Sequence, residues 1–234
     1  MLAVRKLKHG VGNVELVETA EPEIKDNEIL MKVWAAGVCG SDLLIQEDRH
    51  MYTAPVTIGH EYSGIVVDAG KDVKRVKVGD RIVSDIETKE GWLGVSRNGS
   101  YAPLMAIPEE QVYGFSESVS LDHMCFAEPV VATLHSMQER NRVKVGDFVT
   151  VVGPGPMGLL GVEFAKLCGA KAVALIGLRD DEKRLAIGKH VGADYILYSD
   201  DAPEQQIMDL THGRGSDFVL ECSASEKGVQ HALD

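Results

Sequence analysis

One cysteine, one histidine and two glutamates in the first half of the chain could bind a metal ion. They are Cys39, the adjacent pair His60 and Glu61, and Glu128. A thiolate, an imidazole and a carboxylate form a ligand set that zinc binds in catalytic sites, where one coordination position stays open for a substrate. Each residue taken alone is more often a buried apolar or hydrogen-bonded side chain. Their combination with a nucleotide-binding motif predicts a catalytic Zn²⁺ site in which either glutamate could be the third ligand.

A glycine-rich motif in the second half could bind a dinucleotide. It follows the apolar stretch at residues 149–152 and reads Gly153-Pro154-Gly155-Pro156-Met157-Gly158. In a G-x-G-x-x-G turn between a strand and a helix, the first glycine makes the tight turn, the second lets the backbone approach a pyrophosphate, and the third lets the helix pack closely. The motif alone is weakly specific, but its context of alternating strands and helices predicts a binding site for NAD or NADP.

The choice between the two coenzymes depends on the end of the second strand of that half. An acidic residue there normally binds the ribose 2′-hydroxyl, whereas a basic residue suits a 2′-phosphate. Arg179 lies at or near this place, and Asp180 and Asp181 follow it directly. A shift of the turn by one residue would restore an acid, so NAD and NADP both remain open. The same cluster could also be a solvated helix cap.

The elements that must hold these residues differ between the two halves. Up to about residue 141, short apolar runs are broken by glycines, which is typical of a β-rich domain. Residues 129–140 have the spacing of a helix that could lead into the second half. Beyond residue 145, strands and helices alternate, which predicts a parallel sheet covered by helices. We therefore expect an α/β protein with one domain at residues 1–144 and a dinucleotide-binding domain at residues 145–234.

Composition excludes several classes of protein. The net charge of −12 argues against a nucleic-acid partner, because phosphate binding needs a clustered basic surface. The chain has no run of about 18 apolar residues and no apolar signal core near its start, so we expect a cytoplasmic protein without a membrane partner. The four cysteines are widely spaced and form no CxxC pair, which disfavours a disulfide framework.

Five segments together resemble the medium-chain, zinc-dependent alcohol dehydrogenases. They are residues 36–42, 59–64, 79–83, 127–135 and 149–158. The pair Glu128 and Pro129 is most similar to the sorbitol and polyol branch. This resemblance implies a GroES-like catalytic domain beside a doubly wound Rossmann domain, with the active site in the cleft between them. It also implies Zn²⁺, NAD or NADP, a small-molecule alcohol or polyol as substrate, and a homo-oligomer.

The resemblance also implies a role for individual residues. Cys39 and His60 match catalytic zinc ligands, and Glu61 matches the acid that is a ligand in polyol enzymes. Glu128 matches a position that is either a third ligand or a hydrogen-bond partner of zinc-bound water. Ser41 matches the hydroxyl that receives the substrate proton, so Ser41, Glu61 and Glu128 are the expected catalytic residues.

Three features depart from the family pattern. The histidine that usually continues the proton relay is replaced by Leu44, and His50 is a substitute only by its proximity in sequence. Many members carry a four-cysteine zinc lobe, but residues 84–94 contain no cysteine; the abrupt join near residues 89–90 favours a missing segment over a lost lobe. The chain ends at Asp234 soon after the fourth expected strand, so we expect the Rossmann sheet to be incomplete at its C-terminal end.

Two alternatives remain. A zinc-free quinone or enone reductase of the same superfamily would have the same fold, but the joint presence of the four metal-ligand candidates disfavours it. A non-catalytic nucleotide-binding relative would explain the short chain and the absent lobe.

Overall fold

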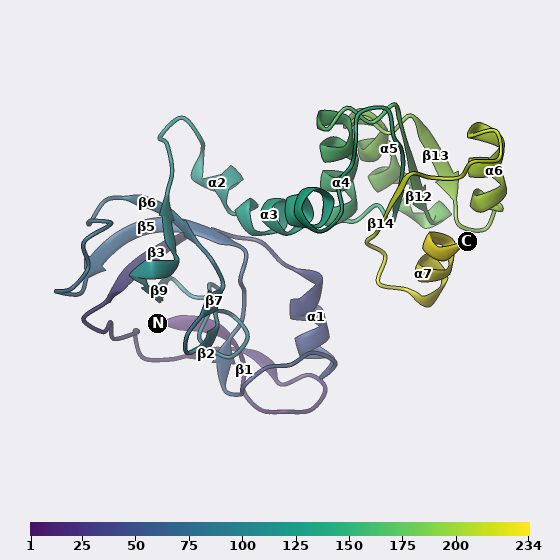
Figure 1. Cartoon of the computed structure of the whole chain (residues 1–234). Helices are drawn as coiled ribbons and strands as arrows, with labels where there is room; N and C mark the ends of the chain where they lie inside the picture. Colours follow the sequence, from purple (N-terminus) through teal and green to yellow (C-terminus); the bar gives the residue numbers. More distant parts are fainter. The chain divides into compact units, whose positions relative to one another are not determined.

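The chain folds into two compact units, Met1–Glu128 and Pro129–Asp234 (Figure 1). A computed structural model describes residues 1–234, except for the side chain of Arg140. The sequence predicted a domain boundary at 144/145, which differs from this division. The physical reason is that Met137 and Val143 are buried in the same apolar core as Val149 and Val162 of the second unit.

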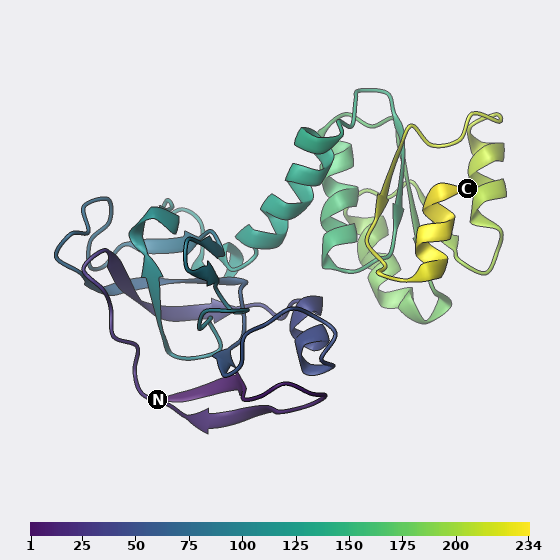
Figure 2. The ribbon, with the colours of Figure 1, turned by 60° about the horizontal axis from the view of Figure 1, so that its bottom comes forward.

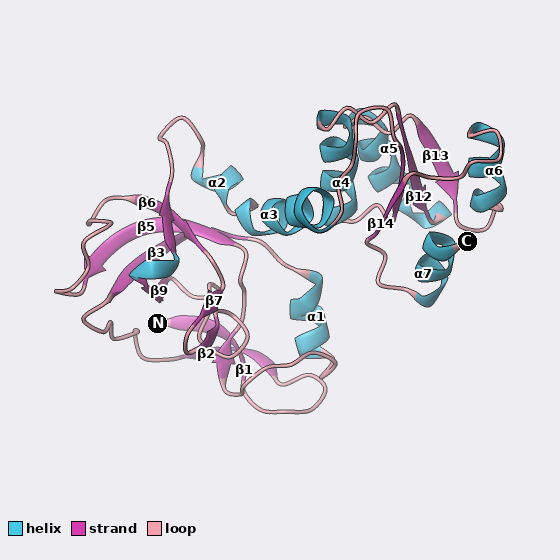
Figure 3. Ribbon diagram, viewed as in Figure 1, coloured by secondary structure: helices cyan, strands magenta, loops and turns pink.

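The first unit consists mainly of short antiparallel strands and loops (Figure 3). A five-stranded sheet has the order β10-β6-β5-β3-β9, and a three-stranded sheet has the order β2-β1-β4. These strands are β1 (Leu2–Lys6), β2 (Val14–Glu18), β3 (Glu28–Ala36), β4 (Val56–Thr57), β5 (Tyr62–Ala69), β6 (Arg81–Ser84), β9 (Leu104–Pro108) and β10 (Val112–Gly114). The helical elements of this part of the chain are α1 (Gly40–Gln46), η1 (Glu109–Gln111) and α2 (Leu121–Met124).

The five-stranded sheet buries one face in an apolar core. Ile29 and Met31 of β3, Val66 of β5 and Ile107 of β9 are fully buried in that core. Side chains alternate between the two faces of a strand, so residues two positions apart, such as Ile29 and Met31, enter the same core.

A small hairpin occupies the region where the resemblance led us to look for a zinc lobe. Strands β7 (Glu87–Thr88) and β8 (Gly91–Trp92) pair antiparallel across residues 89–90. Arg97 holds the hairpin to the rest of the unit, because its guanidinium is 2.7 Å from the carboxylate of Glu28 and 3.7 Å from that of Glu90. Both Arg97 and Glu28 are largely shielded from solvent, which makes this pair stronger than an exposed one. An ion-pair network therefore holds this region of the chain.

The second unit is a parallel sheet with helices on both faces (Figure 2). Its strand order is β13-β12-β11-β14. Its elements are α3 (Ala127–His135), which begins in the first unit, then η2 (Ser136–Arg140), β11 (Phe148–Val152), α4 (Pro156–Leu167), β12 (Ala172–Gly177), η3 (Arg179–Asp181), α5 (Glu182–His190), β13 (Tyr195–Tyr198), α6 (Pro203–Leu210), β14 (Phe218–Glu221) and α7 (Glu226–Leu233).

Alternate residues of the central strands enter two different apolar clusters. Val149 and Val151 of β11 pack with α4 and α5, whereas Val152 packs in the cluster that includes Ile207 of α6. A strand buried on both faces needs a continuous apolar run, which the sequence of β11 supplies apart from Thr150. The predicted Rossmann-type sheet is confirmed. Within the described part of the chain, no helix is both long and apolar enough to cross a membrane.

Candidate functional site

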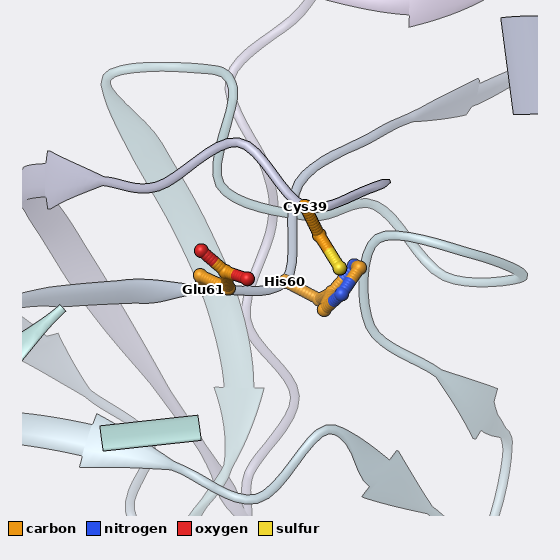
Figure 4. A group of neighbouring side chains, drawn as sticks. All are labelled: Cys39, His60 and Glu61. Carbon is orange, nitrogen blue, oxygen red and sulfur yellow. The ribbon is translucent and has the colours of Figure 1, made fainter. Parts of the chain in front are cut away.

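Three of the predicted ligands lie together in the first unit. The ligand atoms of Cys39, His60 and Glu61 are all within 4.8 Å of one another (Figure 4). His60 and Glu61 are buried, and Cys39 is partly exposed. Ligand atoms around a tetrahedral zinc ion lie about 3.5 Å apart, so this group needs only a small contraction to hold one.

The start of helix α1 fixes the position of Cys39. The carboxylate of Asp42 accepts a hydrogen bond from the backbone N–H of Cys39 at 3.0 Å. The hydroxyl of Tyr101 donates to that carboxylate at 2.7 Å and lies 2.8 Å from the carbonyl oxygen of Gly37. Tyr101 is far from Asp42 in sequence, and nothing in the sequence assigned it a role. The structure identifies it as a residue that positions the turn carrying the thiol.

Two glycines leave space for side chains of the site, Gly37 for Glu61 and Gly59 for Tyr101. A Cβ atom added to Gly37 would overlap the carboxylate of Glu61. Gly59 has φ +95°, a backbone conformation that favours glycine, and a Cβ there would overlap the ring of Tyr101. The glycines that flank the candidate ligands in sequence therefore have a steric function.

The site has an excess of negative groups. Burial lowers the pKa of His60, but its hydrogen bond to Cys39 and the charges of Cys39, Asp42 and Glu128 outweigh this effect and raise the pKa to about 9. Burial raises the pKa of Glu61 and also that of Glu128, in each case against the attraction of His60. Acidic groups are therefore crowded around one histidine, an arrangement that a bound cation would stabilise.

Buried polar atoms indicate that this site fits a metal ion. Among the described residues, Nδ1 of His60 and Oδ1 of Asp42 are buried without a hydrogen-bond partner. These two atoms are 3.8 Å apart, which is too long for a hydrogen bond. Metal-bound histidines commonly use one ring nitrogen as the ligand and donate from the other to a carboxylate. With Asp42 facing Nδ1, the nitrogen available to a metal is Nε2.

The remaining predicted residues lie at different places around this group. The hydroxyl of Ser41 is 3.4 Å from Nε2 of His60, on the side of the candidate ligands. Glu128 is close enough to influence the pKa of His60, but the group whose ligand atoms lie within 4.8 Å contains Glu61 and not Glu128. The ring of His50 is hydrogen-bonded to its own neighbour, with Nδ1 2.8 Å from the carbonyl oxygen of Met51.

Replacing Gly37 with alanine is expected to weaken metal binding without unfolding the protein. The new methyl group would displace the Glu61 carboxylate, and we expect zinc affinity to fall about 10-fold, as for changes that disturb the orientation of a ligand. Gly40→Ala is the matched control, because a Cβ at Gly40 meets nothing within 4 Å. Competition with a zinc chelator measures both variants; equal affinities would contradict this account of Gly37.

The second unit contains a cavity of about 220 Å³ at the carboxyl ends of its strands. The glycine-rich turn forms one wall through Gly153 and Gly155. Gly177 and Leu178, at the end of β12, form another, and Ser199, which follows β13, forms a third. Ligands of open parallel sheets bind at this edge, so the cavity lies where a dinucleotide is expected.

The glycines of the turn have the geometry predicted for them. Gly153 has φ +100°, and a Cβ there would lie 2.8 Å from the backbone of Ser223. A Cβ at Gly155 would meet nothing within 4 Å, so its backbone is open to a ligand, whereas one at Gly158 would overlap the carbonyl oxygen of Gly153. Pro156 is the first residue of α4 and favours helix initiation. The sulfur of Met157 accepts a hydrogen bond from Thr133 at 3.4 Å.

Arg179 lies apart from the glycine-rich turn. Its guanidinium is 2.9 Å from the carboxylate of Asp200 and lies over the ring of Tyr198. Arg179 lines a separate surface depression with residues 180–184, whereas Asp181 and Arg184 reach the cavity itself. On this loop, the residues that line the expected coenzyme site are therefore Asp181 and Arg184, and not the predicted Arg179.

Several lining residues were not identified from the sequence. Ser199 could have been found from its position directly after a strand of the parallel sheet, because such positions face the ligand. Cys222 directly follows β14 and could have been found in the same way, whereas no sequence motif marks His231 on α7, which also lines the cavity.

Comparison with protein-family models gives two matches. Residues 25–117 match the alcohol dehydrogenase GroES-like domain, and residues 156–234 match the zinc-binding dehydrogenase model. Both ranges fall within the two structural units described above.

Similar proteins include two bacterial polyol enzymes. The chain is 32% identical to a sorbitol dehydrogenase of Halalkalibacterium halodurans over 100% of this chain and 73% of that protein. It is 31% identical to a D-arabitol-phosphate dehydrogenase of Enterococcus avium over 100% of this chain and 72% of that protein. A crystal structure described as a zinc-binding dehydrogenase of Sinorhizobium meliloti bound to NADP superposes with a TM-score of 0.87 and 28% identity, covering 99% of this chain and 72% of that chain.

Proposed function

Because this chain belongs to the family of zinc-dependent medium-chain alcohol and polyol dehydrogenases, we propose that it oxidises a hydroxyl-bearing carbon of a polyol with a nicotinamide coenzyme. The observation that carries the proposal is the group formed by Cys39, His60 and Glu61. These residues supply a soft thiolate, an imidazole and a carboxylate, and together they leave one position of a tetrahedral zinc site open. Polyol enzymes at 32% and 31% identity support a polyol substrate, and L-threonine 3-dehydrogenases at 31% identity make amino-acid alcohols the second class to test.

The residues of the chain have distinct roles in this proposal. Cys39, Glu61 and Nε2 of His60 would hold the metal, and Asp42 would orient the ring through Nδ1. When bound, zinc acts as a Lewis acid that makes a substrate hydroxyl more acidic. Ser41 is placed to accept the released proton, because its hydroxyl is 3.4 Å from the same ring nitrogen of His60. Leu44 cannot continue a proton relay, so the proton passes from Ser41 to solvent.

The second unit supplies the coenzyme site. The turn from Gly153 to Gly158 and the N-terminus of α4 hold the pyrophosphate through backbone amides. When bound there, the coenzyme would supply the hydride acceptor that balances the oxidation of alcohol to carbonyl. A homo-oligomeric state and a cytoplasmic location, both expected from the sequence, stay predictions.

Reversible removal of the metal tests this function. The purified protein is expected to reduce NAD or NADP with at least one sugar alcohol or polyol phosphate, to lose this activity after zinc chelation, and to regain it when zinc is returned. Absorbance of the reduced nicotinamide measures the turnover, and elemental analysis measures the zinc content. Turnover that survives complete loss of zinc would support the zinc-free reductase instead. Absence of turnover with either coenzyme and bound zinc would support the non-catalytic alternative.

A further inference from the structure

A serine at the edge of the parallel sheet faces the cavity of the second unit. Ser199 follows β13, and its backbone N–H donates to the carbonyl oxygen of Gly177 at 3.0 Å. Ser199 therefore lies beside the end of β12, on the wall of the cavity that the glycine-rich turn also lines. A dinucleotide whose pyrophosphate lies at Gly153 and Gly155 extends its adenosine half across the end of β12, toward this wall.

The hydroxyl of Ser199 contacts a histidine, which in turn contacts a glutamate on a neighbouring helix. Nε2 of His231, on α7, is 2.7 Å from Oγ of Ser199. Nδ1 of the same ring contacts the carboxylate of Glu204, on α6. The side chain of His231 is only 8% exposed, so bulk water has little access to this contact. We refer to Ser199, His231 and Glu204 as the serine relay.

The serine relay determines which way the hydroxyl proton points. An ionised carboxylate can only accept hydrogen bonds, so Nδ1 of His231 carries the proton that faces Glu204. When the ring carries only this proton, Nε2 has a lone pair, and Ser199 donates its proton to it. This leaves the lone pairs of the Ser199 oxygen as the groups available to the cavity. A buried acceptor is unfavourable unless a donor pairs with it, so this wall selects a ligand that donates a hydrogen bond.

We propose that Ser199 accepts a hydrogen bond from the adenosine half of the coenzyme, and that His231 and Glu204 are positioning residues that keep the serine an acceptor. The proposal rests on the coenzyme site described above. The two donors considered on this half are the 6-amino group of adenine and the 2′-hydroxyl of its ribose. NADP has a phosphate at the ribose 2′ position, which is an acceptor. If the 2′-hydroxyl is the donor, the serine relay also disfavours NADP.

Equilibrium binding of three nucleotides to Ser199→Ala tests the proposal. The full, zinc-loaded chain is titrated by calorimetry, at one fixed alkaline pH, with NAD, NADP and nicotinamide hypoxanthine dinucleotide, in which a 6-oxo group replaces the 6-amino group. We expect Ser199→Ala to bind NAD about 10-fold more weakly than the wild type, as for loss of one buried hydrogen bond. The variant and the wild type should bind equally well the nucleotide that lacks the donor paired with Ser199. This nucleotide is the hypoxanthine analogue if the donor is the 6-amino group, and NADP if the donor is the 2′-hydroxyl.

Other outcomes would overturn the inference. An equal loss for all three nucleotides, or no loss for NAD, would show that Ser199 accepts from neither the 6-amino group nor the 2′-hydroxyl, while the proposed coenzyme site would stand. Failure of the wild type to bind any of the three would overturn the coenzyme site and this inference together. Ser216→Ala is the control. It removes another hydroxyl of this unit, which lies 2.6 Å from the hydroxyl of Thr150, and it should leave all three dissociation constants unchanged.

Variants of His231 separate positioning from a structural role. His231→Leu removes the acceptor for the Ser199 proton and should give the same nucleotide pattern as Ser199→Ala. His231→Gln keeps a side-chain oxygen that can accept this proton, so we expect it to recover part of the affinity for NAD. Thermal melting identifies any variant that is unfolded. If the leucine and glutamine variants bind NAD equally well, His231 does not act through Ser199.

Discussion

Cys39→Ser is expected to lose bound zinc and dehydrogenase activity together. The thiol of Cys39 is one of three ligand atoms within 4.8 Å of one another, and a serine hydroxyl is a much poorer zinc ligand than a thiolate at neutral pH. Zinc sites of proteins contribute about 10 kcal/mol or more in total, so one lost ligand should reduce affinity at least about 100-fold. Elemental analysis after dialysis and the rate of coenzyme reduction measure the two effects.

The matched control for this variant is Cys168→Ser. Cys168 ends α4 in the other unit, where its sulfur lies 2.7 Å from Nε2 of Gln138. This replacement should leave zinc content and activity close to those of the wild type. A Cys39→Ser protein that retains both zinc and turnover would rule out the thiolate as a ligand, and the proposed chemistry would lose its basis.

Glu61→Gln should release the metal, whereas Glu128→Gln should retain it. Glutamine has nearly the shape of glutamate but is uncharged, so the pair of variants isolates the charge of each carboxylate. Glu61 belongs to the group of candidate ligands, and its carboxylate occupies the space that Gly37 leaves open. We expect Glu61→Gln to bind zinc at least about 100-fold more weakly and Glu128→Gln to change zinc affinity little.

Each variant is the control for the other, because both remove one buried or partly buried negative charge near His60. Chelator competition gives the zinc affinities, and thermal melting shows whether each protein is folded. Glu128→Gln can still lower the rate of turnover if Glu128 acts on the substrate or on water. The reverse result, zinc lost from Glu128→Gln and kept by Glu61→Gln, would make Glu128 the third ligand.

The proposed roles also depend on the region that connects the two units. Helix α3 begins at Ala127, inside the first unit, and most of it belongs with the second. The sequence predicted a helix here and a boundary after it. Periodicity identifies such a helix but not the core into which it packs, since an apolar face can be buried against either domain.

Local signals in the sequence were sufficient for much of this protein. The turn from Gly153 to Gly158 lies within six residues, and its function depends on backbone angles and close approaches that only glycine permits. The alternation of strands and helices likewise determines a parallel sheet, because apolar period and strand length are properties of short segments. The resemblance to a known family then identified Cys39, His60 and Glu61 as candidate ligands of one metal ion.

Contacts between distant segments decided the rest. Whether Glu61 or Glu128 approaches the thiol depends on how the segments pack, and sequence spacing contains no such information. Tyr101 meets Asp42, Arg179 turns to Asp200, and His231 links Ser199 to Glu204 across two helices and a strand. None of these pairs is specified by periodicity or by a motif, because each arises only after burial has fixed the positions of both partners. Local chemistry therefore identified the kind of site, and tertiary packing chose the atoms that form it.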